Sequence, residues 1–224
     1  MAATSSSQLN NICVLSGFRC GKYKEFIQAF VDLGRTIAKR KLHLVYGGGV
    51  RGLSKLVSEA AFVRASQVLG IIPKALKPLG CVLDPPTREE LVVSGMQERI
   101  FEMLNHADAF IFLPGDLVTL ESLITFASWA HLNVHKKPIG LLNVNNFYDG
   151  LITFLNHAIK NYFITSSVKK LFIWAPTANE LLDLLQAYKP EPEPDPMTLA
   201  LDWATDDDGS NSRKKCKLDL TLRL

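Results

Sequence analysis

The chain has 224 residues, 47% of them hydrophobic, and a formal net charge of +3 at neutral pH. This length and apolar content suffice for one large domain with a buried core, so we expect one domain and not two. The nearly balanced charge argues against the one-sided basic surface of a nucleic-acid-binding protein, and no direct nucleic-acid contact is expected.

The four cysteines, Cys13, Cys20, Cys81 and Cys216, are scattered and form no Cys-x-x-Cys pair. This spacing favours neither a disulfide framework nor a zinc site, and it is typical of a reducing compartment. The first residues lack the basic and apolar run of a signal peptide, and no stretch reaches about 18 uninterrupted apolar residues. We therefore expect a soluble, cytoplasmic protein without a membrane span.

Short apolar runs of strand length alternate with amphipathic segments of helix length. This alternation predicts a three-layer α/β fold, in which a parallel central sheet carries helices on both faces. Phe26, Phe30, Leu33 and Ile37, for example, are spaced as one apolar stripe on a helix. Strands are predicted at residues 11–15, 42–46, 68–72, 90–94, 109–113, 138–142 and 171–175.

Two helix starts carry capping signals, and one connection is unusually long. Ser94 with Gln97, and Thr177 with Glu180, have the spacing of capping boxes. Residues 72–90 are too long and too interrupted by proline for a simple connection. We expect this segment to form a loop over one edge of the ligand-binding face.

The composition shifts after residue 190 to Glu-Pro-Glu-Pro-Asp-Pro and then to a charged, polar stretch. Such a segment cannot bury enough apolar surface to order itself. We therefore predict a disordered N-terminus over residues 1–10, one domain over residues 11–190 and a disordered tail over residues 191–224.

Three predicted loops leave the carboxyl ends of strands, where an open parallel sheet binds its ligands. They comprise residues 16–22, 46–55 and 114–121. The second loop contains Gly47, Gly48, Gly49 and Gly52. Glycines there let backbone N–H groups approach a phosphate, although one or two would also serve a tight turn. Four glycines between a strand and a helix favour the phosphate interpretation.

The third loop reads Pro-Gly-Asp-Leu-Val-Thr-Leu-Glu and runs into a helix start. Thr119 either caps that helix or binds an anion through its hydroxyl. Glu121 lies in the first turn, where a carboxylate also interacts favourably with the helix dipole. Arg99, in the preceding helix, is either a solvated surface charge or part of the same site.

These motifs together resemble the LOG ("lonely guy") family of cytokinin riboside 5'-monophosphate phosphoribohydrolases, often labelled lysine decarboxylases. The resemblance spans roughly residues 10–190 and rests on ICVLSG, LVYGGGVRGL, VLGIIPKAL, MQERIFEM, ADAFIFLPG, TLES, KKPIGLLNVNNFYDGL and APTANELL. It implies a Rossmann-like fold and a homodimer. It also implies hydrolysis of the N-glycosidic bond of N6-substituted adenosine 5'-monophosphates to free base and ribose 5-phosphate, with neither a metal nor another cofactor.

Carried over position by position, the family's motifs imply Glu121 and Arg99 as catalytic residues. The implied substrate-binding residues are Ser16, Gly17, Gly48, Gly49, Gly52, Met96, Gly115 and Thr119. Departure of the base leaves an oxocarbenium-like sugar, and a carboxylate such as Glu121 can stabilise this positive charge. Arg99 would hold the 5'-phosphate or orient Glu121.

The chain departs from the family at Asp116 and Val118, where the family has glycine. Smaller departures occur at Gln97, Ile100 and Ser122. If residue 118 has a positive φ, a valine there is strained by about 1 to 3 kcal/mol. Asp116 would repel a phosphate by about 4 kcal/mol at 4 Å and an effective dielectric near 20, unless it pairs with Arg51. We expect a hydrolase, and the alternative is a catalytically silent nucleotide-binding or scaffold protein.

Three further patterns carry weaker signals. His131 and His135 have the spacing of a helical metal pair but no third ligand nearby, so no metal is expected. The basic run at residues 212–217 fits a nuclear-import patch or an ordinary tail. Alternate leucines end the chain at Leu218, Leu220, Leu222 and Leu224 and resemble the plant EAR motif, which docks on corepressors. Packing of these leucines on the protein's own sheet edge or dimer mate is the alternative.

Overall fold

The structure of the protein is a computed structural model that describes residues 9–17, 19, 21–48, 53–64, 66–77 and 89–190. The chain divides into two compact units, Met1–Pro190 and Glu191–Leu224, and the elements given below lie in the first. The disordered ends that the sequence predicts lie outside the described residues, except for Leu9 and Asn10. Leu9 is buried, and the N–H of Asn10 donates to the Asp108 carboxylate at 2.9 Å. These two residues therefore pack with the domain.

Seven parallel strands form one sheet in the order β4-β3-β2-β1-β5-β6-β7. The strands are β1 (Asn11–Leu15), β2 (His43–Tyr46), β3 (Val68–Pro73), β4 (Glu89–Val93), β5 (Ala109–Phe112), β6 (Ile139–Leu142) and β7 (Phe172–Ala175). The predicted parallel sheet is confirmed, and no strand end differs from its predicted position by more than one residue. Short apolar runs bounded by polar or turn residues were therefore a reliable signal for buried strands.

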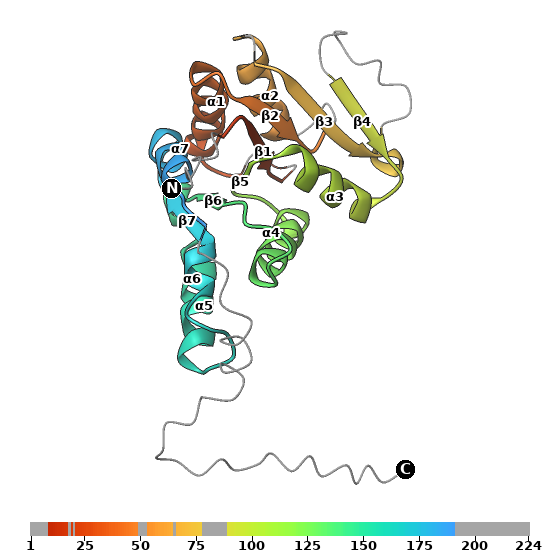
Figure 1. Cartoon of the computed structure of the whole chain (residues 1–224). Helices are drawn as coiled ribbons and strands as arrows, with labels where there is room; N and C mark the ends of the chain where they lie inside the picture. Colours follow the sequence, from red (N-terminus) through yellow and green to blue (C-terminus); the bar gives the residue numbers. More distant parts are fainter. Residues whose placement is uncertain are drawn as a thin grey trace, which may run out of the picture. The chain divides into compact units, whose positions relative to one another are not determined.

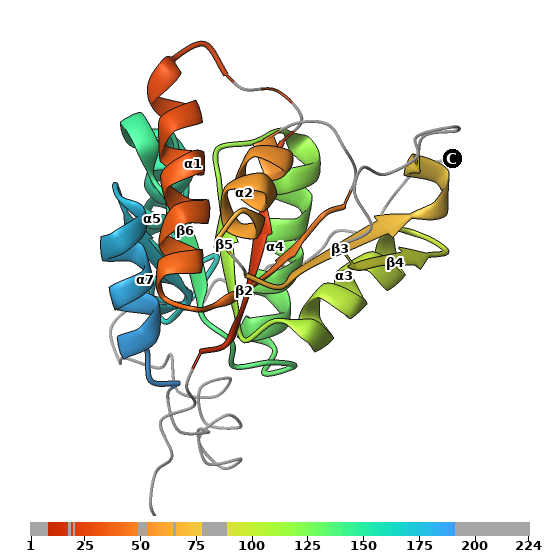
Figure 2. The same ribbon diagram turned by 90° about the horizontal axis from the view of Figure 1, so that it is seen from above.

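Helices cover both faces of the sheet (Figures 1 and 2), which confirms the predicted three-layer α/β fold. Side chains of α1 (Lys24–Lys39), α2 (Leu53–Phe62) and α7 (Ala178–Ala187) pack on one face. Those of α3 (Met96–His106) and α4 (Leu117–His131) pack on the other. The remaining helical segments are η1 (Lys74–Leu76), η2 (Val144–Asn146), α5 (Asp149–Lys160) and α6 (Val168–Leu171).

Strand β1 shows how the sheet separates its two hydrophobic cores. Ile12 and Val14 point into the core beneath α1, α2 and α7, whereas Cys13 and Leu15 point into the core beneath α3 and α4. Successive side chains of a strand face opposite sides, so a strand that is apolar at every position fits between two helical layers. This places Cys13 and Leu15 on the side of the sheet that carries Arg99.

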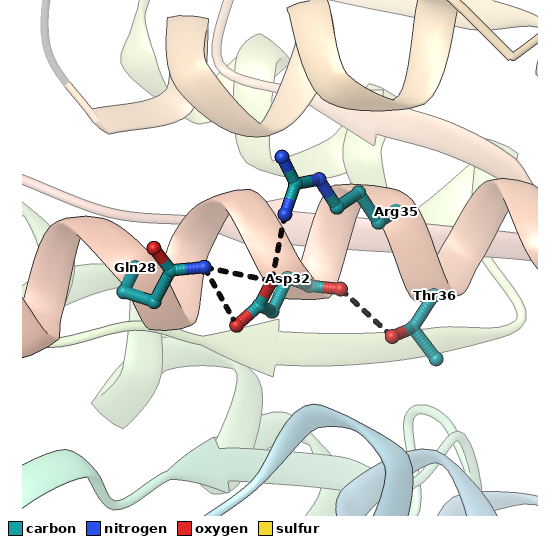
Figure 3. A network of polar contacts seen from close by, with 4 residues as sticks. All are labelled: Gln28, Asp32, Arg35 and Thr36. Atoms are coloured by element: carbon teal, nitrogen blue, oxygen red, sulfur yellow. Dashed lines mark hydrogen bonds and ion pairs between the residues drawn. The ribbon is translucent and has the colours of Figure 1, made fainter.

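Helix α1 buries its predicted apolar stripe and exposes a polar one. Phe30, Leu33 and Ile37 are fully buried. On the polar side, Gln28 donates to both carboxylate oxygens of Asp32 at 3.0 Å, and Arg35 pairs with the same carboxylate at 3.3 Å (Figure 3). These contacts are spaced three or four residues apart, so they lie along one side of the helix.

The two predicted capping boxes have different outcomes. The Thr177 side chain accepts a bond from the N–H of Glu180 at the start of α7, as its spacing predicts. The prediction for Ser94 with Gln97 is wrong, because α3 begins at Met96 with Gly95 as its N-cap. Ser94 instead donates its backbone N–H to Glu98 at 2.6 Å, and its hydroxyl also contacts that carboxylate.

Residues 72–90, which were predicted to form a loop, include regular structure at both ends. The first of these residues complete β3 and form η1, and the last start β4. Lys77 and Glu90 form an ion pair of 2.6 Å that joins the two ends. Residues 78–88 lie outside the described residues. In the part of the chain that the structure describes, every helix is too short or too polar to cross a membrane.

Candidate active site

The loops after β1 and β5 meet where the strand order of the sheet reverses. β1 and β5 are neighbours, but the chain proceeds from β1 toward β2 and from β5 toward β6, on opposite sides. The crevice above such a switch point is where open α/β sheets bind their ligands. The predicted loops 16–22 and 114–121 are therefore adjacent, as parallel-sheet topology requires.

Gly17 and Gly115 allow these two loops to touch. A Cβ on Gly17 would lie 2.9 Å from the backbone nitrogen of Asp116 and 3.0 Å from the Cα of Gly115. A Cβ on Gly115 would lie 2.8 Å from the backbone nitrogen of Gly17 and would also overlap Thr119. Real Cβ atoms are not found this close to a backbone, so both glycines are required by the packing of the two loops.

Asp116 caps helix α4 with its own carboxylate. Its Oδ1 accepts the N–H of Val118 at 3.1 Å and the N–H of Thr119 at 3.3 Å, and the Thr119 hydroxyl lies 3.4 Å from the same oxygen. Of the two roles considered for Thr119, the cap belongs to Asp116. Aspartate is among the best N-cap residues because it satisfies N–H groups that lack a partner inside the helix. Arg51, the predicted partner of Asp116, lies outside the described residues.

The strain predicted for Val118 is wrong. Val118 is the second residue of α4, and it is not among the non-glycine residues with positive φ in the described part of the chain. The aspartate cap explains this conformation, because it starts the helix at Leu117 and places residue 118 within the first turn. A β-branched residue is tolerated there without backbone strain.

A small cleft opens between the start of α4 and α3. It is lined by Leu15, Ser16, Gly47, Arg99, Val118, Thr119 and Ser122. Three of the predicted site residues, Ser16, Arg99 and Thr119, therefore meet in one place. Leu15 and Ser122 were not among the predicted site residues, whereas Gly47 belongs to the predicted glycine loop. Ser122 was noted in the sequence only as a departure from the family, one residue beyond the predicted catalytic carboxylate.

Arg99 projects from α3 across the glycine loop. Its Nε donates to the carbonyl oxygen of Ile71 at 3.3 Å. Its guanidinium occupies the space that a Cβ on Gly47 would take, so a glycine at position 47 permits this placement. Arg99 is partly buried, and it is thus not the solvated surface charge that was the alternative.

The charges around Arg99 are set by burial and by one carboxylate. Burial lowers the pKa of Arg99, while Cys13 and Glu121 oppose this shift. Burial also raises the pKa of the Cys13 thiol to about 12, so Cys13 is neutral near pH 7. Glu121 is therefore the negatively charged group that favours the Arg99 cation. The two predicted catalytic residues therefore interact electrostatically, and Glu121 itself does not line the cleft.

Glu121 lies on the exposed side of the first turns of α4. The hydroxyl of Ser122 lies 3.0 Å from the carbonyl oxygen of Val118 and 3.4 Å from Oε2 of Glu121. The hydroxyl has one proton to donate, and the shorter contact, to the carbonyl oxygen of Val118, makes the stronger hydrogen bond. The Glu121 carboxylate therefore retains most of its capacity to accept hydrogen bonds from a ligand.

The remaining predicted binding residues differ in position. Gly48 has a φ of 68°, and a Cβ there would lie 2.8 Å from the Cβ of Ile72, so both backbone conformation and packing explain the glycine. Met96 is the first residue of α3 and is partly exposed, but it does not line the cleft. Gly49 and Gly52 lie outside the described residues.

A second cavity, of about 190 Å³, lies at the same switch point. Its lining includes Arg19, Asp116 and the aromatic rings of Phe26, Phe30 and Phe147. Phe26 and Phe147 meet edge to face, with ring centroids 6.3 Å apart. The lining contains neither Arg99 nor Glu121. Phe26 and Phe30 were interpreted as core residues because their helical spacing does not distinguish a core from a cavity wall.

Tyr148 fixes the end of β5, and sequence analysis missed it. Its hydroxyl donates to the carbonyl oxygen of Leu113 at 2.6 Å, and its N–H donates to Asn143 at 2.8 Å. Tyr148 is buried, and burial raises its pKa, so the phenol stays protonated and can donate this bond. The start of the loop at Pro114 is thereby held in place.

The two histidines with metal-like spacing have different environments. His131 is exposed, whereas His135 is buried. Nε2 of His135 bonds the carbonyl oxygen of Phe126 at 2.9 Å, and Nδ1 accepts the N–H of Lys137 at 3.2 Å. Both nitrogens of His135 therefore have protein partners. Within the described ranges, no group of three or more His, Cys, Asp or Glu residues is placed to hold a metal ion.

The fold and the site define a class of protein: a Rossmann-like α/β protein whose site lies at the switch point of a parallel sheet. Solved structures support this fold. The molybdenum cofactor binding protein from Rippkaea orientalis aligns with a TM-score of 0.61 at 18% identity, covering 81% of this chain and 98% of that one. The Moco carrier protein from Chlamydomonas reinhardtii aligns with a TM-score of 0.59 at 16% identity, covering 80% and 97%.

The solved structures show the fold, whereas relatives with similar sequences identify the family. A family described as "Possible lysine decarboxylase" matches residues 55–185. The cytokinin riboside 5'-monophosphate phosphoribohydrolase LOG of Oryza sativa subsp. japonica is 45% identical over 185 residues, which are 83% of this chain and 76% of the rice protein. LOG2 of Arabidopsis thaliana, with the same description, is 39% identical over 202 residues, 90% of this chain and 94% of its own. The chain belongs to the LOG family.

Proposed function

We propose that the chain hydrolyses the N-glycosidic bond of N6-substituted adenosine 5'-monophosphates, releasing the free base and ribose 5-phosphate. The observation that carries this proposal is that Arg99 lines a cleft at the switch point of the sheet with Ser16 and Thr119 and interacts electrostatically with Glu121. Its relatives, which are described as phosphoribohydrolases that act on cytokinin riboside 5'-monophosphates, give the substrate class.

The chemistry requires a negative charge close to the sugar. When the bond between C1' of the ribose and the base nitrogen breaks, positive charge develops on C1' and the ring oxygen. The Glu121 carboxylate stabilises that charge and orients the water whose oxygen bonds to C1'. The departing base takes up a proton.

Arg99 supplies the positive charge of the site. Among the hydrogen bonds described, Arg99 uses only its Nε, which donates to the carbonyl oxygen of Ile71. A guanidinium has five N–H donors in all. Arg99 lines the cleft together with Ser16 and Thr119. Arg99 thus binds phosphate or ribose oxygens while its charge holds the Glu121 carboxylate toward the cleft.

The direct test uses purified protein and isopentenyladenosine 5'-monophosphate, with the free base measured by chromatography. Base release that disappears in the Glu121→Gln variant supports the proposal. Glu59→Gln is a suitable control, because Glu59 pairs with Lys55 along α2 and does not line the cleft. Absence of base release by the unaltered protein contradicts the proposal.

The alternative is a catalytically silent nucleotide-binding or scaffold protein, and one observation favours it. Asp116 already occupies the N–H groups at the start of α4 with a negative charge, where the family motif has a glycine. A silent protein would bind the nucleotide in calorimetry without releasing base. Binding and turnover together therefore distinguish the two functions.

We also propose a homodimer formed through the outer side of α4. Leu117, 81% exposed, and Ile124, 49% exposed, flank Glu121 at helical spacings of four and three residues. Helices that are apolar all round are usually buried on all sides. A second copy of the chain on this surface would cover the apolar side chains and shield Glu121 from bulk water, which strengthens its electrostatic effect on the sugar.

Two further expectations stay proposals that rest on the sequence alone. We propose a cytoplasmic location on the basis of the scattered cysteines, and the basic run at residues 212–217 adds nuclear import. The alternate leucines from Leu218 to Leu224 fit a corepressor groove that takes an extended peptide. These leucines lie outside the described residues. Co-precipitation of a corepressor by the full chain, and not by a chain lacking residues 218–224, tests the second.

A further inference from the structure

The N-terminus of α4 is occupied by a carboxylate of the chain itself. Asp116 accepts the N–H of Val118 at 3.1 Å and that of Thr119 at 3.3 Å, with the Thr119 hydroxyl at 3.4 Å. Free N–H groups at a helix start attract anions, and phosphate groups commonly bind there. In this chain, two of those N–H groups and one hydroxyl already contact an anion that belongs to the protein.

The surrounding backbone keeps this carboxylate in place. Gly17 lies so close to the backbone nitrogen of Asp116 that an added Cβ would be only 2.9 Å away. Gly115, the preceding residue, is equally close to Gly17. Since the two loops touch at these atoms, the backbone of Asp116 cannot move toward β1 to withdraw its side chain.

Val118 reduces the space for a phosphate further. Its side chain lines the cleft together with Thr119 and Arg99. A phosphate that reached the N–H groups of residues 118 and 119 would have to displace the Asp116 carboxylate and pass the two methyl groups of Val118. Both requirements act against a charged phosphate, and neither acts against an uncharged hydroxymethyl group.

The charges of the described site balance without a ligand. Arg99 is matched by Glu121, with which it interacts electrostatically. Arg19 and Asp116 line the second cavity together. Among the described residues, these four side chains, two positive and two negative, contribute equal and opposite charge at the switch point. A doubly charged phosphate would disturb this balance, whereas a neutral nucleoside would preserve it.

We infer that Asp116 supplies from within the chain the anion that a 5'-phosphate would otherwise bring, so that this site takes the uncharged N6-substituted adenosine as a substrate. The inference rests on the proposed N-glycosidic hydrolysis. It extends the substrate class from the nucleotide alone to the nucleotide and the nucleoside. The reaction at C1' is the same, with water replacing the base and free ribose as the second product. Asp116 acts on substrate choice and is not a catalytic residue.

The test compares kcat/KM for isopentenyladenosine 5'-monophosphate with kcat/KM for isopentenyladenosine. We expect the unaltered protein to favour the monophosphate by less than about tenfold, because the phosphate gains little at an occupied helix start. Asp116→Gly should raise this preference by about tenfold or more, mainly through a lower KM for the monophosphate. Asp116→Asn keeps an oxygen for the two N–H groups but loses the charge, so its preference should rise by a smaller factor.

Asp32→Asn is the matched control. Asp32 is an exposed aspartate on α1 that is paired with Arg35 and lines neither the cleft nor the second cavity, so this substitution should leave the substrate preference unchanged (Figure 3). A preference above about a hundredfold in the unaltered protein would overturn the inference. So would an unchanged preference in both Asp116 variants.

The inference and the proposed function can fail separately. If the protein hydrolyses only the monophosphate, the inference is wrong and the proposed function stands. If it hydrolyses neither substrate, the proposed function is wrong and the nucleoside is not a substrate either. Calorimetry with adenosine and adenosine 5'-monophosphate then decides only whether Asp116 takes the place of the phosphate: equal binding of both by the unaltered protein, with tighter binding of the monophosphate by Asp116→Gly, would support that role.

Discussion

Glu121 is the residue on which the proposed chemistry depends. It lies on an exposed side of α4, close enough to Arg99 to favour the arginine cation. A glutamine has nearly the same shape but cannot carry the negative charge that a cationic sugar requires. We expect Glu121→Gln to fold and to bind nucleotide, with kcat reduced by about a hundredfold or more. Single-turnover assays measure this, and a rate like that of the unaltered protein would exclude Glu121 from catalysis.

The burial of His135 makes the stability of the protein depend on pH. Burial lowers its pKa, with a weaker opposing effect of its bond to Phe126. The unfolded chain therefore takes up a proton on this residue at a higher pH than the folded chain does. The stability that neutral His135 provides is present above the unfolded pKa of about 6.5 and is lost as the pH falls below it.

Thermal unfolding at pH 7.5 and pH 5.5 tests this expectation. His135→Gln should be less stable at the higher pH, because it loses one of two hydrogen bonds, but it should lose less stability on acidification. His131→Gln is the control, since His131 lies exposed at the end of α4 and has no buried contact to lose. Equal losses in all three proteins would show that other groups cause the acid sensitivity.

At the scale of the elements, the contact between the loops after β1 and β5 positions the site. Gly17→Ala would place a Cβ 2.9 Å from the backbone nitrogen of Asp116. This atom cannot move away as the end of a flexible side chain could. We expect this variant to lose about 1 to 3 kcal/mol of stability, and hydrolysis should fall further because Asp116 and Thr119 shift with the loop. Denaturant unfolding and base release measure the two effects.

Gly150→Ala provides the comparison for that substitution. Gly150 lies in α5, and a Cβ added there would meet no atom within 4 Å. Alanine also favours a helix over glycine by up to about 1 kcal/mol. The variant should therefore be as stable as the unaltered protein or slightly more so. If Gly17→Ala behaved like Gly150→Ala, the close approach of the two loops would be wrong.

At the scale of the whole molecule, the exposed apolar side of α4 predicts the dimer interface. Replacing Leu117 and Ile124 together by aspartate should produce a monomer in light scattering, because a charge on each copy would have to be buried. Base release should fall at the same time, since Glu121 lies between these residues. Phe154→Asp is the control: Phe154 is 65% exposed and lies on a different helix, α5. Dissociation by Phe154→Asp alone would move the interface to α5.

The tail gives a second prediction at this scale. Residues 191–224 are rich in proline and charge, and they lie outside the compact unit that ends at Pro190. Their removal should leave the melting temperature and hydrolysis nearly unchanged, because such a composition cannot form a core. A fall of several degrees in the melting temperature would indicate that the terminal leucines pack on the domain.

The amino-acid sequence by itself determined the architecture of this protein. Seven apolar runs of strand length, separated by amphipathic segments, predicted all seven strands, and parallel-sheet topology then brought the loops near residues 16 and 116 together. Its motifs also predicted Arg99 and Glu121 as site residues, because both follow strands of that sheet at recognisable positions. Periodicity and motif order are local properties, and they survive in the chain without knowledge of its contacts.

Only the tertiary structure decided what Asp116, Val118 and Gly17 do. Whether Asp116 repels a ligand or caps a helix depends on where α4 begins, and the absence of strain at Val118 follows from the same boundary. The need for glycine at position 17 comes from a contact with Gly115, far away in the chain. Helix ends and close contacts between distant segments depend on packing, which the spacing of residues along one chain does not record.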